Sequence, residues 1–222
     1  MGKLIVIDGL DGSGKQTQAG LLEQALQQTG YPVRRLSFPT YTKSSALLEM
    51  YLQGELGGLQ DVNVYAASSF YAADRYASYV QDWGETYRQG GLILTDRYVT
   101  ANAIHQMSRL PKNLWEDYID WLEDLEYTRF GLPRPDLVLF LDVPAELAVE
   151  LIQKRYQGSE NRLDLHERDT AYLLACRETA LYAARRMNWK IVSCAEQDQM
   201  RRVEDIAAEL LTRCEEFLNT AI

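Results

Sequence analysis

The chain is most constrained near its N-terminus, where a glycine-rich run separates an apolar segment from a helical pattern. The apolar segment has strand character, and helical periodicity begins at Lys15. Glycines at this spacing turn successive backbone N–H groups towards an anion, while the helix N-terminus and a lysine add positive charge. The run therefore predicts a phosphate-binding loop for a nucleotide, formed by Gly9, Leu10, Asp11, Gly12, Ser13, Gly14, Lys15, Gln16 and Thr17. A glycine-rich turn with an accidental lysine is the alternative interpretation.

The lysine of this loop is a candidate catalytic residue. We expect Lys15 to be an exposed charge that reaches the outer phosphates of the nucleotide. The next residue is Gln16, where the motif usually has a Ser or Thr hydroxyl that binds Mg²⁺. Gln16 could reach the ion through its amide oxygen or a water molecule, or Thr17 could approach it instead. The sequence thus predicts nucleotide binding and leaves the Mg²⁺ ligands open.

Short apolar segments alternate with longer amphipathic segments along the chain. This alternation is typical of a doubly wound α/β fold, in which helices cover both faces of a five-stranded parallel sheet. We expect a single P-loop domain over residues 1–222, with strands at Lys3 to Asp8, Val33 to Phe38, Leu92 to Asp96, Asp136 to Asp142 and Lys190 to Ser193. The predicted helices are Lys15 to Gln28, Val64 to Arg88, Leu114 to Tyr127, Ala145 to Tyr156, Asp169 to Arg186 and Val203 to Leu218.

Composition argues against several classes of partner. The formal net charge is -9, so the chain lacks the basic surface that nucleic acids and acidic membranes require. No segment approaches the roughly 20 apolar residues that span a bilayer, and no targeting segment is recognised. The three cysteines have neither disulfide-framework nor zinc-site spacing, which favours a reduced, cytoplasmic setting.

A second polar motif follows the third predicted strand. Asp96 and Arg97 lie at its carboxyl end, which is where open α/β sheets bind their ligands. Asp96 is placed to organise Mg²⁺-bound water, and the planar guanidinium of Arg97 suits phosphate oxygens. A structural ion pair is the alternative interpretation of this dipeptide.

Together these motifs resemble the thymidylate kinase family of P-loop nucleoside monophosphate kinases. They occur in the family's order and cover Met1 to about Arg186. The segments that carry the resemblance are Gly9 to Gln18, Phe38-Pro39, Phe70 to Tyr76, Asp96 to Asn102 and Pro135 to Asp142.

The resemblance implies roles for individual residues of a substrate site. Arg97 would hold the 5′-phosphate of the acceptor nucleotide, and Asp11 would accept a hydrogen bond from its sugar 3′-hydroxyl. Phe38 belongs to the same site, and His105 stands where the family often has a tyrosine under the deoxyribose. The resemblance also implies roles towards the base. Tyr71 would stack on the ring, Arg75 would donate a hydrogen bond to carbonyl O4, and Asn102 would lie near the base edge.

The residues themselves support one part of this assignment. Tyr71 and Arg75 are four residues apart, so one helical face presents a ring and a guanidinium to the same flat ligand. For Tyr71, a place in the hydrophobic core is the alternative.

A polar segment at about 155–169 is either a lid or an ordinary surface loop. The resemblance favours a small lid, in which Glu167 helps to bind Mg²⁺ and His166 touches the substrate. A solvated helix start is the alternative for His166. Gly12 stands where one type of family member has a loop arginine, so this chain resembles the type whose catalytic arginine comes from the lid. Arg155 and Arg162 are the candidates.

The activity implied by the resemblance is transfer of the terminal phosphoryl group of ATP to thymidine monophosphate, with Mg²⁺, by a homodimer. A kinase of another nucleoside or monophosphate is one alternative. The other is a regulatory protein that hydrolyses ATP slowly without a phosphoryl acceptor.

Overall fold

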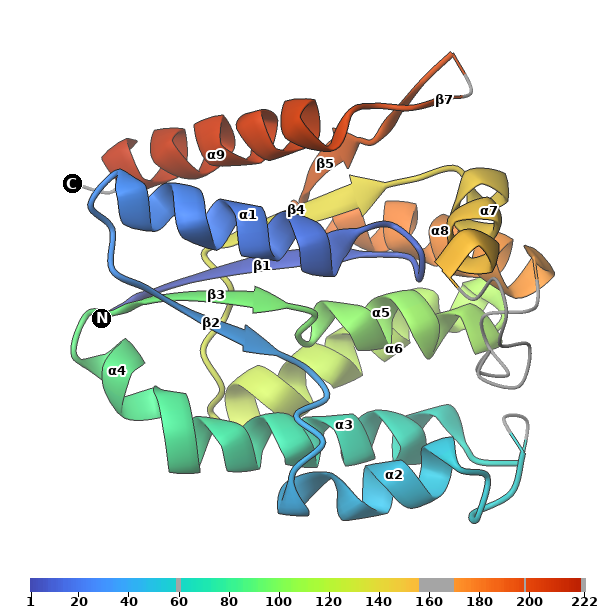
Figure 1. Cartoon of the computed structure of the whole chain (residues 1–222). Coiled ribbons are helices and arrows are strands. Elements are labelled where there is room, and N and C mark those ends of the chain that lie inside the picture. Colours follow the sequence, from blue (N-terminus) through green and yellow to red (C-terminus); the bar gives the residue numbers. More distant parts are fainter. Residues whose placement is uncertain (59–60, 156–169, 198, 221–222) are drawn as a thin grey trace.

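A computed structural model describes residues 1–58, 61–155, 170–197 and 199–220 (Figure 1). Five strands form one sheet in the order β2-β3-β1-β4-β5, and every neighbouring pair is parallel. The expected α/β fold class is confirmed, and each strand end lies within one residue of its prediction. The strands are β1 (Lys3–Gly9), β2 (Val33–Ser37), β3 (Leu92–Asp96), β4 (Leu137–Asp142) and β5 (Lys190–Ser193), with a separate antiparallel pair β6 (Ala195–Glu196) and β7 (Gln199–Met200).

Helices cover both faces of the sheet (Figure 1). Residues of β1 alternate between two cores: Ile5 and Ile7 pack with α1 and α9, whereas Leu4 and Val6 pack with α5, α6 and α8. The α-helices are α1 (Lys15–Gln28), α2 (Ala46–Leu52), α3 (Val64–Ser78), α4 (Gly84–Arg88), α5 (Thr100–His105), α6 (Trp115–Glu123), α7 (Ala145–Arg155), α8 (Thr170–Arg186) and α9 (Val203–Thr220).

Two predicted helices differ from the structure. The helix expected at Val64 to Arg88 is interrupted by a π-helical turn, η2 (Tyr79–Trp83), and the one expected at Leu114 to Tyr127 ends in another, η5 (Asp124–Arg129). A π-turn inserts one residue into an α-helix and changes the face that later side chains occupy. Helices α2 and α5 were not predicted, because segments of seven and six residues are too short to establish a 3.6-residue period. Short 3₁₀ turns are η1 (Lys43–Ser45), η3 (Met107–Arg109) and η4 (Lys112–Leu114).

The loops that carry the predicted site meet at one edge of the sheet. In the parallel register Ile7 lies beside Asp96, and Ser37 lies on the other side of Asp96. The backbone continues this pairing past the strand ends, since the Arg97 N–H donates to the Ile7 carbonyl at 3.0 Å. The sheet therefore brings the loops after β1, β2 and β3 together.

The three cysteines are free and buried. In the described part of the chain, no helix has the length and apolarity needed to cross a bilayer. The lid expected at about 155–169 and its residues Arg162, His166 and Glu167 lie outside the described residues, apart from Arg155 as the last residue of α7. The lid and the extent of the domain stay predictions.

Candidate active site

The glycine-rich loop joins β1 to α1 and requires glycine at two positions. Gly12 and Gly14 have φ values of 81° and 78°, which side chains rarely adopt. A Cβ atom on Gly12 would also lie 2.6 Å from the Ala148 carbonyl oxygen. Gly14 caps α1 without a side-chain hydrogen bond, so the first N–H groups of this 14-residue helix remain available to an anion.

Lys15 does not project from this loop as expected. Its side chain is only 11% exposed, and Nζ donates to the Leu10 carbonyl at 3.0 Å and to Asp11 Oδ1 at 3.4 Å. The prediction of an exposed charge was wrong because the loop curls around its own lysine. Burial and the nearby Arg97 lower the pKa of Lys15, although Asp11 opposes them. Gln16 and Thr17 are exposed, and their roles as Mg²⁺ ligands stay predictions.

Asp11 connects the glycine-rich loop to the end of β3. Arg97 Nη2 and Lys15 Nζ both donate hydrogen bonds to its Oδ1 oxygen. Burial alone would raise the pKa of Asp11, but Arg97 and Lys15 hold that pKa well below its usual range. Asp11 is therefore ionised at every physiological pH.

Arg97 is held in a sparsely populated backbone conformation, with φ at 63°. Its side chain is 25% exposed. Its Nε is buried and has no hydrogen-bond partner among the described residues. Arg97 also lines a cavity, and a planar guanidinium in that position is suited to bind an anion.

Asp96 fits the predicted Mg²⁺ role. Ser37 donates to its Oδ1 at 2.7 Å, while its Oδ2 is buried with no partner among the described residues. An unused carboxylate oxygen accepts a hydrogen bond from a metal-bound water or binds the ion directly. The described residues contain no cluster of three or more His, Cys, Asp or Glu side chains that could hold a metal.

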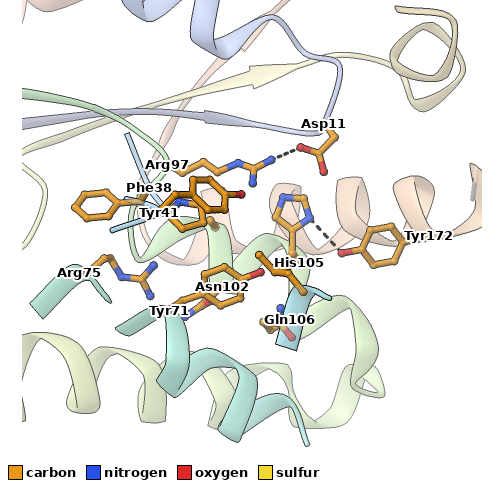
Figure 2. Close-up of a pocket in the computed structure, with 13 residues that line it drawn as sticks. Asp11, Phe38, Tyr41, Tyr71, Arg75, Arg97, Asn102, His105, Gln106 and Tyr172 are labelled. Atoms are coloured by element: carbon orange, nitrogen blue, oxygen red, sulfur yellow. Dashed lines mark hydrogen bonds and ion pairs between the residues drawn. The ribbon is translucent and has the colours of Figure 1, made fainter. Parts of the chain in front are cut away.

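A pocket beside Arg97 brings together seven of the predicted substrate residues (Figure 2). They come from the phosphate-binding loop, the end of β2, α3, the end of β3 and α5. The predicted residues in its lining are Asp11, Phe38, Tyr71, Arg75, Arg97, Asn102 and His105. Sequence reasoning missed the others, which are Pro39, Tyr41, Leu52, Ala101, Gln106 and Tyr172. Figure 2 shows the Asp11–Arg97 pair at one side of this pocket and Arg75 at another.

At the far end of the pocket, Arg75 is 1% exposed and forms a two-point ion pair with Glu126. Burial alone would lower the pKa of Arg75, but the charge of Glu126 raises it above its ordinary value. Glu126 was not predicted, because a glutamate in a charged, amphipathic helix ordinarily faces solvent.

His105 contacts a residue that the sequence did not identify. Its Nδ1 lies 3.3 Å from the Tyr172 hydroxyl, and the two rings stack with centroids 6.3 Å apart. Tyr172 is the third residue of α8, immediately after the segment predicted as a lid. A tyrosine in an amphipathic helix carries no signal that separates a pocket position from a core position.

The loop after β2 is tied to α3 by Asp74, a 1% exposed carboxylate. It accepts hydrogen bonds from the Thr40 backbone N–H at 2.8 Å and the Thr40 hydroxyl at 2.5 Å. The hydroxyls of Ser44 and Ser45 donate to the same carboxylate at 2.9 and 2.8 Å. These contacts fix the loop that supplies Phe38 and Tyr41 to the pocket.

The arrangement combines a phosphate-binding loop, a carboxylate suited to Mg²⁺ and an aromatic pocket with an arginine between them. Comparison with known proteins agrees with this combination. The thymidylate kinase family model matches residues 7–206 of the chain. The chain belongs to the thymidylate kinase family.

Among its relatives, "Thymidylate kinase" of Mycobacterium tuberculosis (strain CDC 1551 / Oshkosh) is 38% identical over 183 residues, which cover 81% of this chain and 84% of the relative. "Thymidylate kinase" of Danio rerio is 26% identical over 221 residues, 97% of this chain and 94% of the relative. "Probable thymidylate kinase" of Thermococcus onnurineus (strain NA1) is 33% identical over 155 residues, 68% of this chain and 71% of the relative.

Replacing Asp74 tests whether this one carboxylate holds the loop after β2 in place. In Asp74→Ala, we expect amides of residues 38–45 to exchange with deuterium about 5- to 150-fold faster, because buried donors lose their acceptor at about 1–3 kcal/mol. Hydrogen–deuterium exchange with mass spectrometry measures this rate. Asp82→Ala is the control, since Asp82 is an exposed carboxylate near the same loop. Unchanged exchange in residues 38–45 of the Asp74 variant would contradict the tether.

Proposed function

We propose that the chain catalyses transfer of the γ-phosphoryl group of ATP to thymidine monophosphate, which yields ADP and thymidine diphosphate. The observation that carries this proposal is the position of Arg97. It joins the phosphate-binding loop through Asp11 and lines the pocket that contains Tyr71 and Arg75. A phosphate-bearing acceptor seated in that pocket would therefore have its phosphate next to the phosphates of ATP.

The proposed chemistry requires positioning and charge neutralisation more than covalent help from the protein. Backbone N–H groups at the start of α1 and Lys15 would bind the phosphates of ATP. Arg97 would hold the acceptor phosphate, whose oxygen is already ionised and needs no strong general base. Mg²⁺ near Asp96 would supply charge neutralisation on the transferred group.

The rest of the pocket suits a nucleoside. Asp11 is an ionised acceptor for the 3′-hydroxyl, and Phe38 and Tyr71 offer aromatic surface to a base. Arg75 provides N–H donors at the other end. His105 and Tyr172 line the same pocket and would face the sugar of a bound nucleotide.

The loop after β2 argues against a nucleoside kinase. Such an enzyme needs a carboxylate there to accept the proton of the 5′-hydroxyl, whereas β2 ends at Ser37 and continues into Phe38, Pro39 and Thr40. A panel assay of ATP with thymidine, thymidine monophosphate, deoxycytidine monophosphate and adenosine monophosphate separates the alternatives. Acceptor-dependent ADP release that is fastest with thymidine monophosphate supports the proposal. A preference for thymidine, or ADP release that needs no acceptor, would overturn it.

Lys15→Ala is expected to lower kcat/KM by at least about 10²-fold, because it removes a preorganised donor from the developing phosphate charge. Circular dichroism should stay unchanged, since the bonds that Lys15 makes to described residues lie within its own loop. Lys3→Ala is the matched control: Lys3 forms an ion pair with Asp136 at the opposite end of β1. Turnover near the original rate in Lys15→Ala would remove the basis for the phosphate-loop assignment.

A catalytic arginine is proposed to come from the segment around the end of α7. Gly12 leaves no arginine in the phosphate loop at that position, and Arg155 and Arg162 are the candidates from the sequence. An arginine of this kind is worth about 10³- to 10⁵-fold in turnover. We expect Arg155→Ala or Arg162→Ala to lower kcat at least about a hundredfold with little change in KM, the sign of an interaction made in the transition state.

Steady-state kinetics of both single variants and the double variant measures this effect. If the double variant keeps kcat within about tenfold of the original enzyme, the arginine does not come from this segment. Lys43→Ala provides a control, because its charge lies in the loop after β2. Its removal should leave kcat unchanged.

The enzyme is further proposed to act as a cytoplasmic homodimer. Tyr76 and Val80 are apolar side chains with 44% and 59% exposure, on α3 and on the π-helical turn that follows it. A second copy would cover both. Light scattering after gel filtration should give twice the chain mass of 25.4 kDa, and a value of one chain mass would contradict the dimer.

A further inference from the structure

Glu126 is a fully buried carboxylate on the π-helical turn η5, and it lies behind the pocket without lining it. Arg75 donates to it twice, from Nε at 2.7 Å and from Nη2 at 2.6 Å. Asn102 Nδ2 lies 3.4 Å from its Oε1. Both partners line the pocket, so one hidden carboxylate orients two side chains that face the ligand.

The contacts of Arg75 determine which hydrogen-bond donors it offers to a ligand. A guanidinium has five N–H donors and no acceptor. Glu126 takes two of them, and the Tyr98 carbonyl takes one from Nη1 at 3.3 Å. Two donors on the terminal nitrogens have no hydrogen-bond partner among the described residues. Arg75 therefore presents a ligand with donors in an orientation fixed by Glu126.

The contacts of Asn102 leave it with a hydrogen-bond acceptor for a ligand, whereas Arg75 offers donors. Its Nδ2 donates to the Ser68 carbonyl at 3.2 Å and faces Glu126, so both amide hydrogens point to protein oxygens. A carboxylate only accepts hydrogen bonds, and it thus favours the rotamer in which the NH₂ group is turned towards it. The amide oxygen Oδ1 has no hydrogen-bond partner among the described residues and is left for the pocket, which Asn102 lines.

This donor and acceptor pair matches one class of pyrimidine edge. Thymine presents an acceptor at O4 next to a donor at N3, which complements donors from Arg75 and an acceptor from Asn102. Cytosine presents the reverse, an amino donor at C4 and an acceptor at N3. Cytosine would therefore meet a mismatch at both positions.

We propose that Glu126 is a positioning residue that selects the base by fixing the hydrogen-bond polarity of Arg75 and Asn102. This inference rests on the proposed function, in which a thymine nucleotide occupies the pocket. A purely structural ion pair makes a different prediction, because its loss would weaken the protein or slow the enzyme equally for every acceptor.

Glu126→Gln is the variant that tests this role. It keeps the size of the side chain, removes the charge and replaces an acceptor oxygen by a donor group. Asn102 is then free to turn its NH₂ group into the pocket, where it suits N3 of cytosine. We expect the ratio of kcat/KM for thymidine monophosphate over deoxycytidine monophosphate to fall about 5- to 150-fold, the effect of leaving buried polar groups mismatched. The kcat with thymidine monophosphate should change less than its KM.

Two further variants keep the test decisive. Glu126→Asp retains the charge with a shorter reach and should give a smaller fall in the ratio, and it replaces Glu126→Gln if that variant does not fold. Glu209→Gln is the matched control. Glu209 lies on helix α9 and also binds two arginines, Arg201 and Arg213. It should leave the ratio unchanged.

Arg75→Ala separates the failure of this inference from failure of the proposed function. If Arg75→Ala lowers the ratio while both Glu126 variants, folded by circular dichroism, keep it, Glu126 does not set the polarity. An equal loss of kcat/KM for both acceptors would also overturn the inference and assign Glu126 a structural role. If the unaltered enzyme phosphorylates neither acceptor, the proposed function itself has failed.

Discussion

The parallel pairing of β1 with β3 is the constraint on which the candidate site depends. Its register places Ile7 beside Asp96, and the backbone hydrogen bond from Arg97 to Ile7 extends the pairing beyond the strand ends. The loop after β1 and the turn after β3 are consequently neighbours, which allows Asp11 and Arg97 to form an ion pair. Through that pair the glycine-rich loop and the pocket lined by Arg97 share one boundary. The proposed phosphoryl transfer between two bound nucleotides needs this adjacency.

Buried carboxylates then give the pocket its rigidity. Asp74 gathers four hydrogen bonds from the loop after β2, and Glu126 holds Arg75 and Asn102. Asp8 is fully buried under the phosphate loop, where the Thr100 hydroxyl donates to it at 2.5 Å and burial raises its pKa. Burying a charge is unfavourable unless hydrogen bonds compensate it, and each of these groups has such partners. The protein thus uses buried acceptors to hold the segments around the pocket, and the donors bound by Glu126, Arg75 and Asn102, line the pocket itself.

The sequence predicted the sheet and the central residues of the site because both have strong local signals. The glycine spacing before Lys15 marks the loop, and apolar strands ending in polar residues mark the edge where ligands bind. Glu126 and Tyr172 lacked such signals, since their roles arise from contacts between residues far apart in the chain. Lys15 was expected to be exposed, and its burial follows from the curl of a loop that no periodicity describes. The chemical roles of all the predicted site residues, His166, Glu167, Arg155 and Arg162 among them, stay predictions.

Phosphorus NMR of the complete reaction tests the central claim most directly, because it identifies where the phosphoryl group goes. The protein would be mixed with ATP, Mg²⁺ and thymidine monophosphate, and the spectrum followed as ATP is consumed. The account predicts that ADP and the β-phosphorus signal of thymidine diphosphate grow together in equal amounts while orthophosphate stays at the level of a protein-free sample. Orthophosphate as the main product, with thymidine monophosphate unchanged, would contradict it.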